Sequence, residues 1–368
     1  MILLNNINKL EGNFKHGNCR IQSLWDFLKL HDIFVNPNLL YLHCFDILTA
    51  LCYILYKNLE YLFLVGFTEN FEETFFKKNN IRYQVTNEVN SMNDMVTFIK
   101  NGIPLYILCD INTILTQKIP KDGVQIGVCS GLVVVGVDFP GEVICNQMLP
   151  KAKGEFLSID YSVFSRARTL TMYPSSPQNK CIYLELEENQ NITISKQLND
   201  VDVLIERLSR IFSNVLNNNI QMISNVGVIG ICNIDAFITL KSELKKLGEI
   251  DNTPGVAREI IDKVFASKML ILRKSMLSGT ISFNRYELAD ALSALYEITK
   301  NPKLKKASNL FRESGNKLRQ ISRFLYMVSS YIYQKEEFVN EIIDILDEVL
   351  NIEIQASEEL SNLCCYHI

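Results

Sequence analysis

The chain has little of what marks a metal site or a disulfide scaffold. Its ten cysteines include no Cys-x-x-Cys pair, and it has only four histidines in 368 residues. Cysteine and histidine at ligand spacing are therefore missing, which disfavours a structural zinc site. Secreted disulfide scaffolds are short and dense in cysteine, and no signal peptide is evident here. We expect reduced thiols in a cytoplasmic protein, with no metal and no organic cofactor.

The sequence also has little excess of one sign of charge and few long apolar runs. The formal net charge is −4, which gives no electrostatic reason to expect nucleic acid or an anionic membrane as partner. Residues 39–56 form the only run with nearly the length of a membrane span, but the run contains His43 and Asp46. We expect a buried helix there and no membrane partner. A homodimer is left open.

What is present is ordinary globular composition, with 48% hydrophobic and 21% charged residues. The length allows two domains at roughly 150 residues per domain. Mixed strand and helix patterns give way to helical periodicity after a polar stretch, 188–195. This shift predicts an α+β protein with a mixed domain over residues 1–190 and an all-helical domain over residues 191–368.

Hydrophobic periodicity predicts the elements of both domains. In the first domain the expected helices cover residues 20–30, 39–56, 69–78, 93–100 and 161–168, and the expected strands cover 61–67, 81–85, 105–110, 132–135, 143–145 and 181–186. The strands at 132–135 and 143–145 are joined by a Pro-Gly turn, which indicates an antiparallel hairpin. In the second domain the expected helices cover residues 203–216, 256–276, 285–299, 303–327 and 336–363.

Cys19 is the main candidate for chemistry. It directly precedes an amphipathic helix, where the helix macrodipole lowers thiol pKa and favours the thiolate nucleophile. The other interpretation is a buried structural cysteine. A thiol nucleophile usually needs a base, and no histidine is an obvious one. His16 is close in sequence, but its position before the helix does not require its ring to lie beside the sulfur.

Six segments in order resemble the butirosin biosynthesis protein H family, and the likeness spans nearly the whole chain. The segments are NCRIQSLWDFL (18–28), GIPLYILCD (102–110), SGLVVVGVD (130–138), VICN (143–146), FSRAR (164–168) and GTISFNRYELADAL (279–292). The resemblance implies a papain-like N-terminal domain followed by a helical domain. It also implies an acyltransferase of specialised-metabolite or antibiotic biosynthesis, with an acyl carrier protein as partner.

The resemblance assigns roles to individual residues. Cys19 would accept an acyl group from the carrier's phosphopantetheine thioester, and an amine would then attack this acyl-enzyme to give an amide. The family's histidine base falls on Ser130, and the acid that orients it falls on Asn146. Papain-like enzymes also use asparagine to orient their histidine. Asn13 lies six residues before Cys19, the spacing of the oxyanion-hole glutamine in papain-like enzymes.

The chain departs from the family pattern at its base, because position 130 holds serine in place of histidine. Serine cannot take the thiol proton near neutral pH, and losing a general base costs about 10²–10⁴-fold in rate. Three interpretations follow. Cys19 still accepts acyl groups, with His16 or the incoming amine handling protons. Alternatively, the domain is catalytically impaired and binds an acyl chain, a carrier protein or a partner enzyme. In the third, Cys19 is only packed.

Overall fold

The structure is a computed structural model that describes residues 1–368 except 11–17, 46, 48, 67, 69, 119, 121–122, 147–155, 218–220, 224–228, 249–257, 278–281, 331–334 and 364–368. Two compact units are present. Unit 1 comprises Met1–Cys44 and Asn70–Asp200, and unit 2 comprises Phe45–Glu69 and Val201–Ile368. The division differs from the contiguous 1–190 and 191–368 that the sequence predicts, because a segment of the N-terminal half belongs to unit 2.

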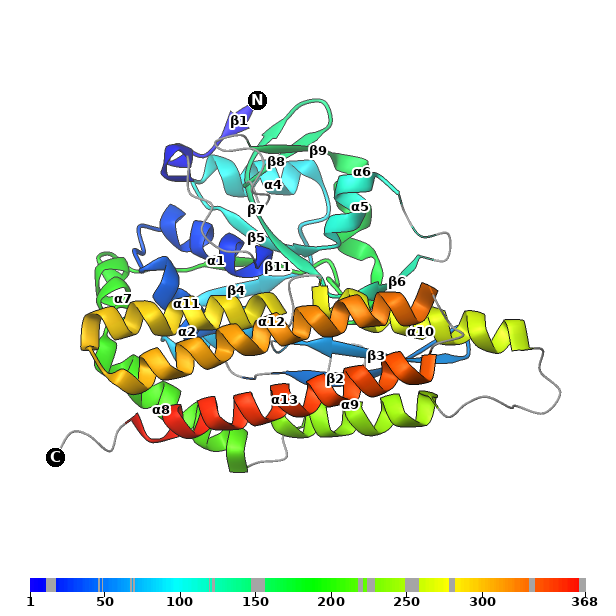
Figure 1. Ribbon diagram of the computed structural model, residues 1–368. Helices are drawn as coiled ribbons and strands as arrows, with labels where there is room; N and C mark the ends of the chain where they lie inside the picture. The colour runs from blue at the N-terminus through cyan, green and yellow to red at the C-terminus, as the bar shows by residue number, and fades with distance from the viewer. Residues whose placement is uncertain are drawn as a thin grey trace. The chain divides into compact units, whose positions relative to one another are not determined.

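Unit 1 is mixed α/β (Figure 1). Its helices are η1 (Ile7–Leu10), α1 (Cys19–Leu30), α2 (Pro37–Cys44), α3 (Phe71–Lys78), α4 (Met92–Lys100), α5 (Ile111–Thr116), α6 (Tyr161–Thr169) and α7 (Gln190–Leu198). Its strands are β1 (Ile2–Leu3), β4 (Tyr83–Thr86), β5 (Leu105–Cys109), β6 (Val124–Gly127), β7 (Ser130–Asp138), β8 (Glu142–Cys145), β9 (Leu157–Asp160), β10 (Thr171–Pro174) and β11 (Cys181–Leu184).

The main sheet of unit 1 is antiparallel throughout. Its strand order is β4-β11-β5-β7-β8-β9, and β1 pairs with the far end of β7. β7 and β8 form the antiparallel hairpin that the sequence predicts. Between the expected strands 105–110 and 132–135, where the sequence predicts no element, the structure contains α5 and β6, and β6 pairs in parallel with β10. β7 lies in the middle of this sheet, and eight of its nine residues are buried.

Helix α1 is buried on all sides. Its N-cap is Asn18, whose side chain accepts hydrogen bonds from the backbone N–H groups of Arg20 and Ile21. An asparagine cap satisfies donors that the first helical turn leaves unpaired, so the helix begins at Cys19. Every residue from Arg20 to Leu30 is buried, including five polar ones. Polar side chains in such a helix need internal partners. Ser23, Asp26 and the Arg20 side chain find hydrogen-bond partners in the site described below, whereas the Lys29 ammonium lies 4.6 Å from the centre of the Trp25 ring.

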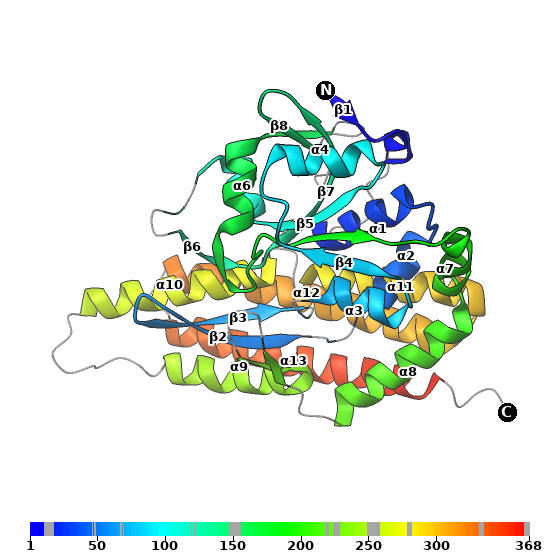
Figure 2. The ribbon, with the colours of Figure 1, turned by 180° about the vertical axis from the view of Figure 1, so that it is seen from behind.

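Unit 2 joins long helices to a small sheet, so the expectation of an all-helical domain is wrong. Its helices are α8 (Val201–Asn217), α9 (Asn233–Gly248), α10 (Arg258–Leu277), α11 (Ser282–Thr299), α12 (Pro302–Ser330) and α13 (Lys335–Ser361). Its strands are β2 (Ala50–Tyr56), β3 (Leu59–Val65), β12 (Gln221–Ile223) and β13 (Ile229–Cys232), and they form an antiparallel sheet in the order β12-β13-β2-β3. Figure 2 shows the β2–β3 hairpin beside α9 and α10.

The apolar run 39–56 is not one buried helix, as the sequence suggested. Its first part is α2 and its second part is β2. β2 pairs with β3 along its whole length, and the two strands are joined by Lys57 and Asn58, both with positive φ (51° and 61°). Two consecutive residues with positive φ are typical of the tight turn of a two-residue hairpin. Within the described part of the chain, no helix combines the length and apolarity that crossing a membrane requires.

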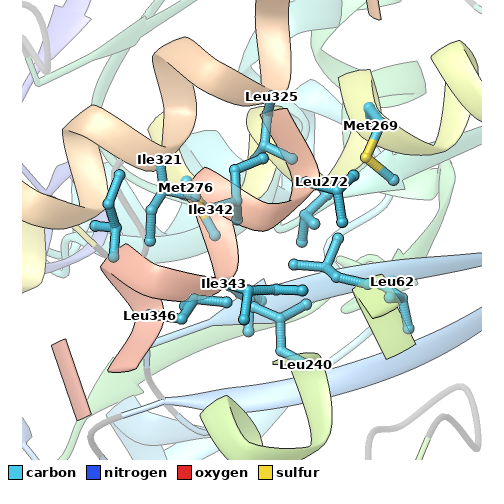
Figure 3. Packing of buried hydrophobic residues seen from close by; sticks show 14 of the residues in the cluster. Leu62, Leu240, Met269, Leu272, Met276, Ile321, Leu325, Ile342, Ile343 and Leu346 are labelled. Carbon is cyan, nitrogen blue, oxygen red and sulfur yellow. The ribbon is translucent and has the colours of Figure 1, made fainter. Parts of the chain in front are cut away.

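The core of unit 2 includes the hairpin. Leu62 and Leu64 of β3 pack with residues of α9, α10, α12 and α13 (Figure 3). In α12, Ile321 and Leu325 face this core from one side of the helix, and Leu346 of α13 lies in the same cluster. Removing this much apolar surface from water is the main stabilising contribution to a helical unit. The helices of unit 2 therefore depend on a segment that is more than 130 residues away in sequence.

Helix α11 holds both ends of the hairpin segment. The Asn284 side chain donates to the Gly66 carbonyl at 3.0 Å, just after β3. The Arg285 guanidinium donates to the Thr49 hydroxyl at 2.7 Å, just before β2. The same guanidinium forms a buried two-pronged ion pair with Glu353 of α13, at 2.7 and 2.9 Å. Two neighbouring residues of one helix thus tie the inserted hairpin to unit 2.

Candidate active site around Cys19

Cys19 is the first residue of α1, so the helix begins one residue earlier than the predicted 20–30. Eight described cysteines are free, and Cys19 is the one among them that is not buried. The residue as a whole is partly exposed, but its thiol group is desolvated by burial. The helix start favours a reactive cysteine, whereas burial of the thiol favours a structural one.

Ser130 lies directly opposite the thiol. The Cys19 Sγ donates to the Ser130 Oγ over 3.3 Å, although the two residues are 111 positions apart in sequence. Ser130 is the first residue of β7 and pairs across the sheet with Cys109, the last residue of β5. β7 begins near the start of α1, which brings the Ser130 hydroxyl to the Cys19 sulfur. The structure therefore brings together the cysteine and the residue that the resemblance aligns with a histidine base.

The electrostatics of the thiol differ from expectation. Burial raises the pKa of the Cys19 thiol above its usual value, and the Ser130 hydrogen bond and the positive charge of Arg20 oppose that rise only in part. The sequence predicted a lowered pKa from the helix macrodipole, but the net shift has the opposite direction, because desolvation by burial is its largest cause. The shift favours the thiol over the thiolate.

A buried ion pair lies next to Cys19. The Arg20 guanidinium donates to both carboxylate oxygens of Glu72, at 2.8 and 2.5 Å, and stacks 4.5 Å from the centre of the Phe71 ring. The Tyr106 hydroxyl donates to the same carboxylate at 2.6 Å. Because Glu72 neutralises most of the charge of Arg20, the stabilisation that Arg20 can give to a Cys19 thiolate is limited.

A close approach between α1 and β7 completes the surroundings of the thiol. The Ser23 hydroxyl, one turn after Cys19, donates to the Gly131 carbonyl at 2.8 Å. A Cβ on Gly131 would overlap the Tyr106 hydroxyl. Position 131 therefore has to be glycine for Tyr106 to reach Glu72, and this fixes the strand that carries Ser130 against the helix that carries Cys19.

Asn146 is tied to α1 and not to Ser130. Its side-chain amide donates to Asp26 at 2.8 Å and to Ser23 at 3.3 Å, and its carbonyl oxygen accepts from the Val133 N–H at 2.7 Å. These bonds use both N–H groups of the amide and one acceptor site of its oxygen. Asn146 therefore holds α1 against the sheet two turns away from the thiol, and it does not orient Ser130 directly.

The described histidines lie elsewhere. His31, at the end of α1, packs edge-on against Phe27 with ring centres 5.0 Å apart. His43 places its Nε2 2.9 Å from the Leu198 carbonyl oxygen. Neither is among the groups that hydrogen-bond to Cys19 or shift its pKa. The two assisting residues proposed from the sequence, Asn13 and His16, lie outside the described residues.

Sequence reasoning missed the residues that surround the thiol. Glu72 and Tyr106 were not singled out; Tyr106 is a polar residue in an apolar segment, whereas Glu72 lies among other charged residues and gave no such signal. Ser23 and Asp26 were also missed. Their signal was available, because with Cys19 they have the spacing i, i+4, i+7 that places side chains on one face of a helix. A polar stripe in a helix that is otherwise apolar indicates a buried polar contact.

The arrangement can hold a thiol beside an alcohol, but it supplies no imidazole from the described residues. Nor do the described histidines, cysteines and acids gather into a group of three that could bind a metal ion. No protein-family model matches this chain, and neither does any curated protein. The chemistry of the site therefore rests on its geometry.

Proposed function

We propose that unit 1 is a papain-like domain that takes an acyl group from a carrier-protein thioester onto Cys19 and passes it to an amine. The observation that supports this best is the 3.3 Å contact between the Cys19 thiol and the Ser130 hydroxyl at the junction of a helix start and a strand start. The resemblance aligns this pair with the cysteine and the base of an acyltransferase. The free, mainly buried thiols support placing the protein in a reducing cytosol.

Thioester exchange suits a thiol without an imidazole. In the first step the Cys19 sulfur bonds to the acyl carbon, the carbon–sulfur bond to the pantetheine arm breaks, and the Cys19 proton moves to the departing thiolate. Ser130 can relay this proton, because a hydroxyl both donates and accepts. The departing thiolate is a good leaving group, so no general acid is required. Amide hydrolysis, whose amine leaving group needs a proton, is not expected.

The second step releases the amide and regenerates the free Cys19 thiol. The amine nitrogen bonds to the acyl carbon, the bond to the Cys19 sulfur breaks, and the resulting thiolate takes the proton that the nitrogen must lose. Burial raises the pKa of the Cys19 thiol, so its thiolate is a strong proton acceptor. The same shift makes it a slower leaving group. We therefore expect modest turnover with strongly nucleophilic amines as acceptors.

Intact-protein mass spectrometry with a panel of N-acetylcysteamine thioesters tests the proposal. The native protein should gain one acyl mass, and Cys19→Ala should gain none. Cys109→Ala is the matched control, because Cys109 is a fully buried cysteine of the same unit that pairs with Ser130, and it should be acylated like the native protein. Adding an amine should then release the acyl group as an amide.

Two substitutions at position 130 sharpen the test. Ser130→His restores an imidazole at the aligned base position and should speed acylation by at least about tenfold. Ser130→Ala should slow it, since the hydrogen bond that lowers the pKa of Cys19 is lost. Circular dichroism checks that both variants are folded, because Ser130 is buried. Equal rates in all three proteins would contradict a role for Ser130 in proton transfer.

A second candidate is a catalytically impaired member that binds an acyl chain, a carrier protein or a partner enzyme. The raised pKa of Cys19 and the hydroxyl at the base position favour this alternative. It predicts no adduct with any thioester, slow alkylation of Cys19, and binding of a carrier protein that survives Cys19→Ala. The mass measurement above therefore separates the two candidates directly.

A further inference from the structure

A small hollow in unit 2 is lined by charged residues of both signs. It is formed by strand β3 and helices α9 and α10, and it is called the β3 hollow below. Its volume is about 240 Å³. Pockets that take drug-sized molecules have roughly 300–1,000 Å³, so the β3 hollow has room for a small ligand only. Its charged lining residues are Glu60, Glu243, Lys246 and Lys268.

The apolar part of the β3 hollow belongs to the core of unit 2. Leu62, Met269 and Leu272 line the hollow, but they are only 7%, 1% and 0% exposed and are members of the core cluster (Figure 3). Their apolar surface is already used in packing, and little of it remains for a ligand. Recognition in the β3 hollow therefore has to come from its charged residues.

Two of the four charged residues compensate each other. Glu243 and Lys246 form an ion pair at 2.7 Å within α9. Glu60 and Lys268 make no hydrogen bond or ion pair with any described residue, and they do not pair with each other. The β3 hollow therefore has one carboxylate and one ammonium group whose charges no partner neutralises.

These two groups come from different sides of the β3 hollow. Glu60 lies two residues before Leu62 on β3, so both side chains are on the same face of the strand. Lys268 lies one helical turn before Leu272 on α10, so these two are on the same side of the helix. Leu62 and Leu272 belong to one core cluster. The free carboxylate is thus on the strand side, and the free ammonium on the helix side, of the same small space.

Negative charge gathers on the strand side. Tyr53 of β2 pairs with Leu62 across the β2–β3 hairpin. Burial raises the pKa of Tyr53, and the negative charges of Glu243 and Glu60 raise it further. Both carboxylates therefore lie near the same phenol. Because Lys246 already neutralises Glu243, Glu60 is the carboxylate that remains for a cationic group of a ligand.

We propose that the β3 hollow binds a small free amino acid as a zwitterion, with its ammonium group at Glu60 and its carboxylate at Lys268. A ligand with a single charge would neutralise one of these residues and leave the other uncompensated. A zwitterion can form a charge-assisted hydrogen bond with each of them, and such hydrogen bonds are stronger than neutral ones. The small volume of the hollow favours an amino acid with a short side chain.

Ligand-observed NMR titrations of the full chain with three probes of similar size test the site. L-alanine carries both charges, ethylamine carries the positive charge alone, and propionate carries the negative charge alone. Alanine should bind saturably, and each of the other probes should bind more weakly by about tenfold or more, because each lacks one charged hydrogen bond. Propionate or ethylamine binding as tightly as alanine would overturn the zwitterion, and so would the absence of saturable alanine binding.

Two substitutions assign the two charges. In Glu60→Gln, alanine should bind only as tightly as propionate, and the affinity for propionate should be unchanged. In Lys268→Gln, alanine should bind only as tightly as ethylamine, and the affinity for ethylamine should be unchanged. A general loss of structure cannot produce this crossed pattern, because it would weaken all three probes. The reverse pattern would overturn the placement of the two ligand charges.

Glu259→Gln and Lys263→Gln are the matched controls, because these residues form an exposed ion pair on α10 and do not line the β3 hollow. Each control should change alanine binding by less than about twofold, since the attraction of exposed charges is screened. Equal weakening in a control and in its counterpart would mean general charge attraction and would overturn the site. The titrations contain no thioester, so their result does not depend on the proposed function.

Discussion

Both units contain an arginine–glutamate pair that is buried from solvent, and the two pairs serve different parts of the molecule. In unit 1 Arg20 and Glu72 are 0% and 2% exposed, and in unit 2 Arg285 and Glu353 are 1% and 0% exposed. Each pair joins two helices, with two hydrogen bonds between guanidinium and carboxylate in each. Burying such charges is tolerated only when the geometry is good and further hydrogen bonds satisfy the remaining atoms.

The two ion pairs differ in the hydroxyl groups that form further hydrogen bonds with them. Tyr106 completes the unit 1 pair, and Arg20 is the neighbour of Cys19 in sequence, so that pair borders a reactive group. Thr49 and Ser314 complete the unit 2 pair, at 2.7 and 2.5 Å, and they belong to the hairpin segment and to α12. The same motif therefore affects the electrostatics of a site in one unit, and in the other it holds a distant segment in place.

The largest expected effect comes from breaking each pair with the same isosteric change. Glu72→Gln and Glu353→Gln each leave a buried arginine without its counterion, which costs about 3–5 kcal/mol. Urea denaturation measures both. Trp25 is the only tryptophan and is buried in unit 1, so its fluorescence reports that unit. Circular dichroism reports the helices of both units, and the longest of these belong to unit 2. A loss below about 1 kcal/mol in either variant would show that its pair is not needed for stability.

Removing the hydroxyl partners should have a smaller effect. Tyr106→Phe removes a donor to Glu72, and Thr49→Val removes the group that accepts from Arg285. Each leaves a buried charged group short of one hydrogen bond, at a cost of about 1–3 kcal/mol. The same two probes report the loss. If Thr49→Val left unit 2 unchanged, the attachment of the hairpin would depend on apolar packing alone.

Reactivity of Cys19 should separate the two pairs most clearly. Glu72→Gln leaves the charge of Arg20 uncompensated, which lowers the pKa of the Cys19 thiol, so alkylation by iodoacetamide at pH 7.5 should accelerate by about threefold to tenfold. Glu353→Gln should leave the rate unchanged. The site of alkylation is checked by peptide mapping, because partial unfolding would expose other cysteines as well. An equal acceleration in both variants would indicate general loosening.

The units should also differ in acid sensitivity. Burial lowers the pKa of His31 from its usual 6.5 to about 4. The unfolded chain therefore takes up a proton at a higher pH than the folded one, and unit 1 should lose stability as pH falls from about 6.5 to about 4. The described residues of unit 2 include no histidine. Urea midpoints followed by Trp25 fluorescence at pH 7 and pH 5 should differ less in His31→Gln than in the native protein.

The long helices of unit 2 were predictable from local pattern. The expected helix 303–327 is Pro302–Ser330 in the structure, and 336–363 is Lys335–Ser361. Helices of this length repeat their apolar positions over many turns, so the signal is strong. Short elements gave no such signal. The two-residue β1 and the four-residue β6 form only because partners elsewhere in the chain supply their hydrogen bonds.

The site was predictable only in part. That Cys19 starts a helix follows from a local signal, and Ser130 came from the resemblance of a short segment. Asn146 was expected beside the base position, but its amide pairs with Asp26 and Ser23. An asparagine at a strand end does not reveal its partner, since the partner depends on which helix packs there.

By itself, the sequence determined the features that depend on neighbouring residues. Asn18 caps α1 so that Cys19 is its first residue, and the helical period of apolar residues produces α12 and α13. Only the tertiary structure decided the direction of the Cys19 pKa shift, the partners of Asn146 and the unit to which β2 and β3 belong. Capping and periodicity act over a few residues of chain. Desolvation and long-range pairing depend on which distant segments exclude water from a group, and that is defined only when the chain has folded.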